Sequence, residues 1–244
     1  MQEVRMQFPV SSEHKAIAFH EGEFLVKTLT DDADLQQAYR LRHRVFAETL
    51  GWVPSAEDGT EMDMYDLWGV TVGVFARDGV LLGMARLLPP SGKFMLENEF
   101  GALLPRGYAI RKEPDTAEIT RLAVSPDIHD ARRSSRILLG VLKGIYQWAV
   151  DNEIRYYYLE VEQRFLRALR MLGFPCEPIG PVVNLSPADV GVVAGIYDMV
   201  RFDEENRYKR PAFLEWISTL ATPTGTLVTG RTSTFSHRPV PALA

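Results

Sequence analysis

The sequence lacks the features of a secreted, zinc-binding or membrane-spanning protein. Its single cysteine, Cys176, cannot form a disulfide within the chain, and no Cys/His cluster has the spacing of zinc ligands. No run of about 18 apolar residues could cross a bilayer, and the N-terminal segment carries acids where a signal peptide needs a continuous apolar stretch. We therefore expect a cytoplasmic protein with no metal site and no membrane span.

Two further absences narrow the function. The formal net charge of −5 argues against a general nucleic-acid surface. Neither GxGxxG nor GxxxxGK occurs, which disfavours a dinucleotide enzyme or a P-loop ATPase. What remains is a chain of 244 residues, 46% hydrophobic and 24% charged, which is typical of a globular protein with a substantial core.

The order of the secondary-structure signals predicts an α/β fold. Asp78-Gly79 separates two β-rich arms and predicts a hairpin, and Thr30 is a candidate N-cap for the first helix. Further strands are predicted near 24–29, 117–124, 155–161 and 190–200, and helices within 125–152, over 164–174 and from Pro211. We expect one domain over residues 1–200 and a C-terminal extension over 201–244 with a short helix and a loose tail.

Two arginines stand among apolar residues. A helical wheel places Arg42 in the middle of an apolar arc, and Arg86 occupies an apolar row of its strand. Burying an unpaired charge costs several kcal/mol, so each needs an anion unless its side chain reaches solvent. The stretch GTEMDMYDLW supplies Asp63 and Asp66, with Glu61 close by.

The segment EITRLAV pairs an acid with a base on one strand. Strict alternation puts Glu118 and Arg121 on opposite faces, and only a bulge would bring them to the same side. Without a bulge the two are an ordinary surface pair.

The long helix begins with cations. Arg132, Arg133 and Arg136 stand at the end where the helix dipole favours anions, so the pattern indicates either an anion site or a solvated loop. A phosphate-bearing donor or a carrier protein's phosphopantetheine arm fits the first reading. Gly140 and Gly144, one turn apart, allow another element to approach closely.

The polar and aromatic signals share an order and spacing with one known family. They are Arg42, Phe46 and Trp52 in RLRHRVFAETLGW, Asp63 and Asp66 in EMDMYD, Arg86 in GMARLLP, Phe100 in MLENEFGALLP, and Glu118 and Arg121 in EITRLAV. Over roughly residues 30–180 the chain resembles the acyl-homoserine lactone synthases, the LuxI-type autoinducer synthases. The resemblance implies a GNAT-like acyltransferase fold, a mixed central sheet flanked by helices.

The resemblance also implies a reaction. An acyl group moves from an acyl-carrier-protein or acyl-CoA thioester to the amine of S-adenosylmethionine, and lactonisation then releases methylthioadenosine and a quorum-sensing signal. Both reactants are substrates, and no cofactor is expected. Two alternatives stay open: a GNAT-fold acyltransferase that uses a different amine, and a non-catalytic domain that binds one of these ligands.

Roles follow from the resemblance and from charge. Glu118 is the candidate general base and Arg121 orients the network. The residues expected around S-adenosylmethionine are Arg42, Phe46, Trp52, Asp63, Asp66, Arg86 and Phe100. Asp63 and Asp66 are also expected to pair with the inward Arg42 and Arg86. The side chains expected to face an acidic carrier protein or the phosphates of coenzyme A are Arg132, Arg133, Arg136 and Lys143. The apolar residues of YYYLEV (156–161) and RFLRALRML (164–172) are the expected wall of the acyl pocket. Leu159 on this strand points to an unsubstituted or unusual acyl group.

Overall fold

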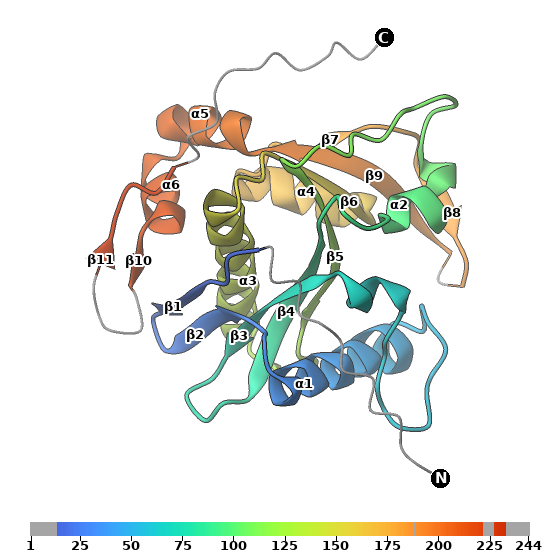
Figure 1. Cartoon of the computed structure of the whole chain (residues 1–244), viewed down its shortest axis with the longest axis horizontal. Helices are drawn as coiled ribbons and strands as arrows, with labels where there is room; N and C mark the ends of the chain where they lie inside the picture. The colour runs from blue at the N-terminus through green and yellow to red at the C-terminus, as the bar shows by residue number, and fades with distance from the viewer. Residues whose placement is uncertain (1–13, 188, 222–226, 233–244) are drawn as a thin grey trace.

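The backbone forms one mixed β-sheet covered by helices on both faces (Figure 1). The structure, a computed structural model, describes residues 14–187, 189–221 and 227–232. Within these residues the strands pair in the order β11-β10-β1-β2-β3-β4-β5-β6-β9-β7, and β8 pairs with β9. Their bounds are β1 Ala18–Glu21, β2 Phe24–Thr28, β3 Val70–Phe75, β4 Leu81–Leu88, β5 Thr116–Val124, β6 Tyr156–Glu162, β7 Glu177–Pro178, β8 Val183–Leu185, β9 Val190–Asp198, β10 Leu220–Ala221 and β11 Leu227–Val228.

Helix α3 (Ala131–Asp151) covers one face of the sheet, and α1 (Asp32–Arg42) covers part of the other. The other helical segments are the π-helix η1 (His43–Thr49), the 3-10 helices η2 (Met64–Leu67) and η3 (Gly101–Leu103), and α2 (Met95–Asn98), α4 (Gln163–Leu172), α5 (Met199–Lys209) and α6 (Pro211–Ser218). No helix in the described parts of the chain is long and apolar enough to span a membrane. The layers confirm the predicted α/β fold with a mixed central sheet.

The predicted hairpin is present. β3 and β4 pair antiparallel, with Val70 opposite Leu87, and Gly79 in the turn has φ +82°, a conformation that glycine adopts without strain. The other predicted elements correspond to β2, β5, β6, β9, α3, α4 and α6. Neither β1 nor α5 was predicted.

Two predicted boundaries do not match the structure: the start of the first helix and the end of the main domain. Asp31, and not Thr30, caps α1, because its carboxylate accepts a hydrogen bond from the Asp34 N–H at 2.9 Å. The boundary expected at residue 200 falls inside α5, and Phe202 and Ile217 belong to the same hydrophobic core as α3. Of the predicted loose tail, only residues 227–232 lie within the described part of the chain.

The two glycines of α3 let the helix lie close to the sheet, as predicted. A Cβ on Gly144 would lie 2.6 Å from Cγ1 of Val72, and one on Gly140 would lie 3.3 Å from Cγ2 of Val74. Larger residues there would push α3 away from β3, so these glycines set the distance between helix and sheet.

Two irregularities in β5 shape the region of the site. A register shift against β4 leaves one extra residue in β5 between Thr120 and Ala123, which is a β-bulge. The parallel pairing with β6 ends at Ile119 and Leu159, and beyond this point β5 pairs with β4 while β6 pairs with β9. The two strands therefore separate, and their facing backbone groups have no ladder partner across the opening.

Candidate active site

Six charged side chains meet between the end of α1, the segment before β3, and strands β4 and β5. They are Arg42, Arg86, Arg121, Glu61, Asp63 and Asp66, which we call the arginine–carboxylate cluster. Three positive and three negative charges sum to zero, so the cluster as a whole is neutral.

Two carboxylates of the segment before β3 fix its local backbone conformation. Asp63 accepts a hydrogen bond from the Tyr65 N–H at 2.9 Å, and Asp66 accepts one from the Asp63 N–H at 2.8 Å, which together cap η2. The Glu61 N–H donates to the carbonyl oxygen of Tyr39 at 3.0 Å and ties the segment to α1. Side-chain capping thus fixes a stretch whose apolar pattern fits neither a helix nor a strand.

Arg42 ends α1, where the helix widens into η1. Its side chain is fully buried and donates hydrogen bonds to Glu61 Oε2 and, at 2.6 Å, to Asp66 Oδ1. Burial disfavours the charge of Arg42, but Asp66 and Glu61 outweigh burial and raise its pKa. The arginine is therefore paired inside the protein and does not reach solvent.

Arg86 on β4 is also fully buried. It donates to Asp66 Oδ1 at 2.7 Å, to Asp63 Oδ2 at 3.0 Å and to the Thr120 hydroxyl at 3.1 Å. The prediction that both inward arginines pair with Asp63 and Asp66 is confirmed.

Arg121 sits at the bulge of β5, with φ +51°. A non-glycine residue in this region costs about 1–2 kcal/mol, and here two charged hydrogen bonds of 3.0 Å, from Nη2 to Glu61 Oε1 and to Asp63 Oδ2, oppose that cost. Met95 touches both Arg121, through its sulfur, and Glu118, through its N–H. The bulge, which the sequence analysis named as the condition, therefore brings Glu118 and Arg121 to the same side.

The cluster keeps Glu61 and Asp66 ionised. Burial opposes ionisation of Glu61, but hydrogen bonds from Arg42 and Arg121 prevail and lower its pKa to about 2. Burial likewise opposes ionisation of Asp66, and the charges of Arg42 and Arg86 lower its pKa. These carboxylates stay charged across the physiological range.

Only one edge of the cluster reaches solvent to an appreciable extent. The side chains of Asp63 and Arg121 are 20% and 14% exposed, whereas those of Arg42 and Arg86 are not exposed at all. The accessible edge therefore offers one carboxylate and one guanidinium next to each other.

Two of the three predicted aromatic residues adjoin this edge. The rings of Phe46 and Trp52 have centroids 6.1 Å apart, and the Arg121 guanidinium lies 5.4 Å from the centre of the Phe46 ring. Phe100 packs in a different apolar cluster, with Leu96 and Leu103 around α2 and η3. The structure thus brings Phe46 and Trp52 together but places Phe100 apart from them.

Glu118 on β5 is fully buried beside the first turn of α2. Its two carboxylate oxygens accept hydrogen bonds from the N–H groups of Met95, at 2.6 Å, and Leu96, at 2.8 Å. Burial raises the pKa of Glu118 to about 7, although the two N–H groups act in the opposite direction. A carboxyl group that titrates near neutral pH can accept a proton and release it again.

A small apolar cavity of about 30 Å³ lies beside the opening between β5 and β6. Its lining combines Ile119 and Leu159, the last paired residues of those strands, with residues of α3, α4, β9 and the segment before β7: Leu142, Ile145, Tyr146, Leu169, Phe174, Cys176 and Tyr197. Two segments predicted to form an acyl pocket, 156–161 and 164–172, contribute Leu159 and Leu169. Cys176 is buried there, as expected of a small core residue.

The predicted basic surface is only partly as expected. Arg132 and Arg133 are exposed at the start of α3. Arg136 pairs with Glu23 at 3.2 Å, and Lys143, two turns further on, pairs with Glu21. Lys143 is 3% exposed and faces the β1–β2 hairpin, so the prediction that it faces an acidic carrier was wrong. Because positions seven apart share a helix face, Lys143 follows Arg136 toward these acids.

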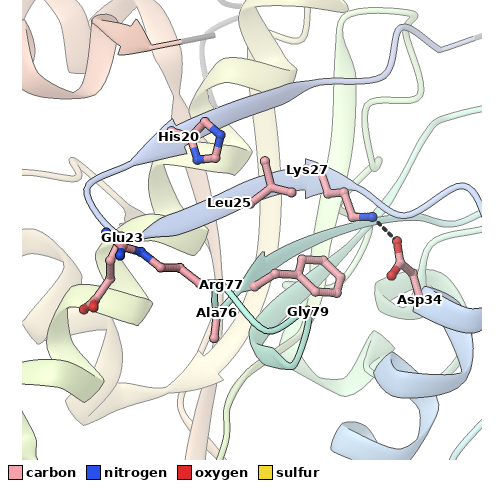
Figure 2. Close-up of a pocket in the computed structure, with 9 residues that line it drawn as sticks. His20, Glu23, Leu25, Lys27, Asp34, Ala76, Arg77 and Gly79 are labelled. Atoms are coloured by element: carbon pink, nitrogen blue, oxygen red, sulfur yellow. Dashed lines mark ion pairs between the residues drawn. The ribbon is translucent and has the colours of Figure 1, made fainter. Parts of the chain in front are cut away.

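Figure 2 shows another cavity, of about 290 Å³, near the start of α1 and the turn between β3 and β4. Lys27 and Asp34 form an ion pair at its wall, and His20, Glu23 and Arg77 also line it. None of the predicted site residues lines this cavity, and its mixed charges define no ligand class. In the described residues no group of three metal-ligating side chains occurs.

A mixed sheet flanked by helices, with a buried carboxyl group on β5 beside its bulge, fits the GNAT-like acyltransferase class expected from the sequence. The sequence model of the autoinducer synthase family matches residues 26–209, so the chain belongs to the autoinducer synthase family. The acyltransferase activity and the role in quorum-sensing signal synthesis expected from the sequence follow from that membership.

Individual relatives agree with this assignment. An acyl-homoserine-lactone synthase of Rhizobium radiobacter is 33% identical over 155 residues, which cover 62% of this chain and 73% of the relative. The crystal structure of the AHL synthase LasI matches with a TM-score of 0.64 at 23% identity, covering 74% of this chain and 90% of LasI. The CoA-dependent synthase BjaI, solved with SAM and isopentyl-CoA, matches with a TM-score of 0.63 at 22% identity over 74% and 86% of the two chains. At these identities the two structures show a shared fold.

Glu61 is the cluster member that the sequence reasoning did not assign to the site. It stands two residues before Asp63, so in an extended segment the two side chains point the same way, and this spacing was the available signal. Its pairing with Arg42 and Arg121 depends on residues far away in the chain, which the local sequence does not encode.

Proposed function

We propose that this protein is an acyl-homoserine-lactone synthase that uses S-adenosylmethionine as acceptor and an acyl thioester as donor. The acceptor amine attacks the thioester carbonyl and expels the thiol. The carboxylate oxygen of the acceptor then attacks the carbon next to the sulfonium, and methylthioadenosine leaves. The observation that carries the proposal is the accessible edge of the arginine–carboxylate cluster, which matches the charges of the acceptor.

S-adenosylmethionine presents an ammonium and a carboxylate at one end and a sulfonium near its middle. In our proposal Asp63 binds the ammonium and Arg121 binds the carboxylate, because these are the cluster members with the most exposed side chains. The Phe46 ring lies next to Arg121, and the Trp52 ring lies beside Phe46. These rings attract the sulfonium, with a gain of roughly 0.5 to 2 kcal/mol. Arg42, Arg86 and Glu61 hold this edge in place through ion pairs with Asp63 or Arg121. Asp66 holds it through the hydrogen bond that its side chain accepts from the Asp63 N–H.

Glu118 is the proposed general base. The acceptor nitrogen must lose a proton before it can attack, and a base with a pKa of about 7 accepts a proton at neutral pH without holding it too tightly. Because Glu118 is fully buried, the proton reaches it through a water molecule. Backbone N–H groups at the β5 bulge are the candidate donors to the oxyanion of the tetrahedral intermediate.

The opening between β5 and β6 is the proposed place of the thioester. The unpaired backbone groups along its edges can hydrogen-bond an extended pantetheine arm. The apolar cavity next to Ile119 and Leu159 is only about 30 Å³, so its lining side chains must move apart to admit an acyl chain. Arg132 and Arg133, at the start of α3, supply positive charge for an acidic carrier protein or for the phosphates of coenzyme A. The cytoplasmic location expected from the sequence remains part of this proposal.

The test is a product assay. Purified protein is incubated with S-adenosylmethionine and a panel of acyl-carrier-protein and acyl-CoA thioesters, and mass spectrometry follows lactones and methylthioadenosine. We expect both products, in equal amounts, with at least one donor. Loss of thioester without methylthioadenosine would assign a different acceptor amine, and thermal stabilisation by either ligand without turnover would indicate a binding domain.

A further inference from the structure

A second carboxyl group, that of Glu160, lies beside Glu118. β5 and β6 run parallel with Glu118 opposite Tyr158, and alternation puts Glu160, two residues later, on the same face of the sheet as Glu118. This register sets the two carboxyl groups side by side, and each changes the pKa of the other. Two neighbouring carboxyl groups can share a hydrogen bond only if one of them carries a proton.

The partners of the two carboxyl groups differ. Glu118 accepts hydrogen bonds from two backbone N–H groups, and the charge of Arg86 also favours its ionised form. Glu160 as a residue is only partly buried, but its Oε1 is buried and accepts no hydrogen bond. An ionised carboxylate with a buried and unpaired oxygen is costly, whereas the carbonyl oxygen of a neutral acid tolerates this position better.

Among the described residues, the charged group that acts on Glu160 is Glu118, and no cation does. Arg86 of β4 and Tyr65 of η2 interact with Glu118 instead. On β6 the neighbour on the same face is Tyr158, on β9 the residue opposite is Ala194, and α2 contributes its backbone N–H groups. Burial and the neighbouring Glu118 raise the pKa of Glu160 well above its usual range. Because hydrogen-bond donors and Arg86 favour an ionised Glu118, and no such group favours an ionised Glu160, the negative charge belongs on Glu118 and the proton on Glu160.

We propose that Glu160 is a positioning residue for the base: it keeps a proton and donates it in a hydrogen bond to the Glu118 carboxylate. This proposal rests on the proposed function, because it assumes that Glu118 is the base. The hydrogen bond holds Glu118 against α2 and favours its ionised, proton-accepting form.

Three variants test the proposal. Glu160→Gln keeps a neutral hydrogen-bond donor, whereas Glu160→Leu removes the donor. Glu162→Gln is the matched control, since Glu162 lies two residues further along the same face and pairs with Arg164. The measurements are kcat/KM for S-adenosylmethionine against pH and the affinity of each variant for S-adenosylmethionine.

We expect Glu160→Leu to move the acid limb of the profile to higher pH by about one to two units, because an ionised acid that loses a hydrogen bond becomes a stronger proton binder. Glu160→Gln and Glu162→Gln should leave the limb in place. If Glu160 were ionised, both substitutions at Glu160 would remove a negative charge and move the limb to lower pH. That result, or an unchanged limb in Glu160→Leu, would overturn the proposal.

A second measurement does not depend on turnover or on the stability of Glu160→Leu. In protein labelled with ¹³C at the glutamate carboxyls, one NMR resonance should still have the chemical shift of a neutral acid at pH 8 and be missing in Glu160→Gln. If every glutamate is ionised at that pH, the inference is wrong, whether or not lactone is made. If the neutral resonance is present but no donor yields lactone, the proposed function fails while the hydrogen bond stands.

Discussion

The arginine–carboxylate cluster and the Glu118–Glu160 pair both bury carboxyl groups near the bulge of β5, with opposite results. In the cluster, the guanidinium groups of Arg42 and Arg121 overcome burial and lower the pKa of Glu61 to about 2. At the pair, burial prevails and raises the pKa of Glu118 to about 7. The number of cations in contact, and not burial itself, decides the charge. The cluster therefore offers a constant charge pattern for binding, and the pair offers a group that can change its charge.

The largest expected effect comes from removing the group that changes charge. Glu118→Gln keeps the shape of the side chain but cannot accept a proton, so kcat should fall by about 10²- to 10⁴-fold. Affinity for S-adenosylmethionine, measured by calorimetry, should change little, because the proposed binding edge belongs to the cluster. A variant that keeps its kcat would remove Glu118 from the mechanism.

Breaking the cluster should instead destabilise the fold. Arg42→Met leaves the buried Glu61 and Asp66 without one of their cations, and the free energy of unfolding should fall by about 3 to 5 kcal/mol. Urea denaturation measures this loss. Arg44→Met, at an exposed residue that pairs with Asp127 on the surface, is the control and should cost less than about 1 kcal/mol. Equal losses in the two variants would contradict the contrast between buried and surface pairs.

The two regions should also give stability opposite slopes with pH. The folded pKa of Glu61 lies below its ordinary 4.5, so its contribution to stability is present above pH 4.5 and is lost as pH falls toward 2. The folded pKa of Glu118 lies above 4.5, so burying it lowers stability as pH rises from 4.5 to about 7. Denaturation of Glu61→Gln should show a smaller loss in acid, and Glu118→Gln a smaller loss between pH 5 and pH 7, each compared with the unchanged protein.

The smallest expected effect lies outside both regions. Reversing the exposed charges in Arg132→Glu/Arg133→Glu should raise KM for the acyl donor several-fold, on the order of 1 kcal/mol, and the effect should shrink at high salt. The matched control, Lys143→Met, removes a charge that faces the β1–β2 hairpin, so it should alter stability but not the donor KM. Unchanged donor kinetics in the double reversal would exclude the start of α3 as a donor surface.

Local sequence patterns predicted correctly which residues face inward, because that depends on short-range periodicity. The helical wheel and strand alternation identified Arg42 and Arg86 as inward arginines, and the spacing in EITRLAV made a bulge the condition for Glu118 and Arg121 to act together. These predictions succeeded because burying an unpaired charge is costly enough to constrain its neighbours.

The missed features depend on contacts between distant segments. Glu160 lies next to Glu118 because of the parallel register of β5 and β6, which no local pattern fixes. Lys143 faces inward because β1, an unpredicted strand, places Glu21 beneath α3.

The pairing of β1 with β10 has a consequence for how the chain is made. His20 lies opposite Ala221, so the outer neighbour of β1 comes from near the C-terminal end of the described chain. Translation proceeds from the N-terminus, and domains begin to fold while later residues are still being added. On the ribosome, the edge of β1 therefore stays open to pairing with other chains until residue 221 has emerged, and nascent chains are most exposed to aggregation during this interval.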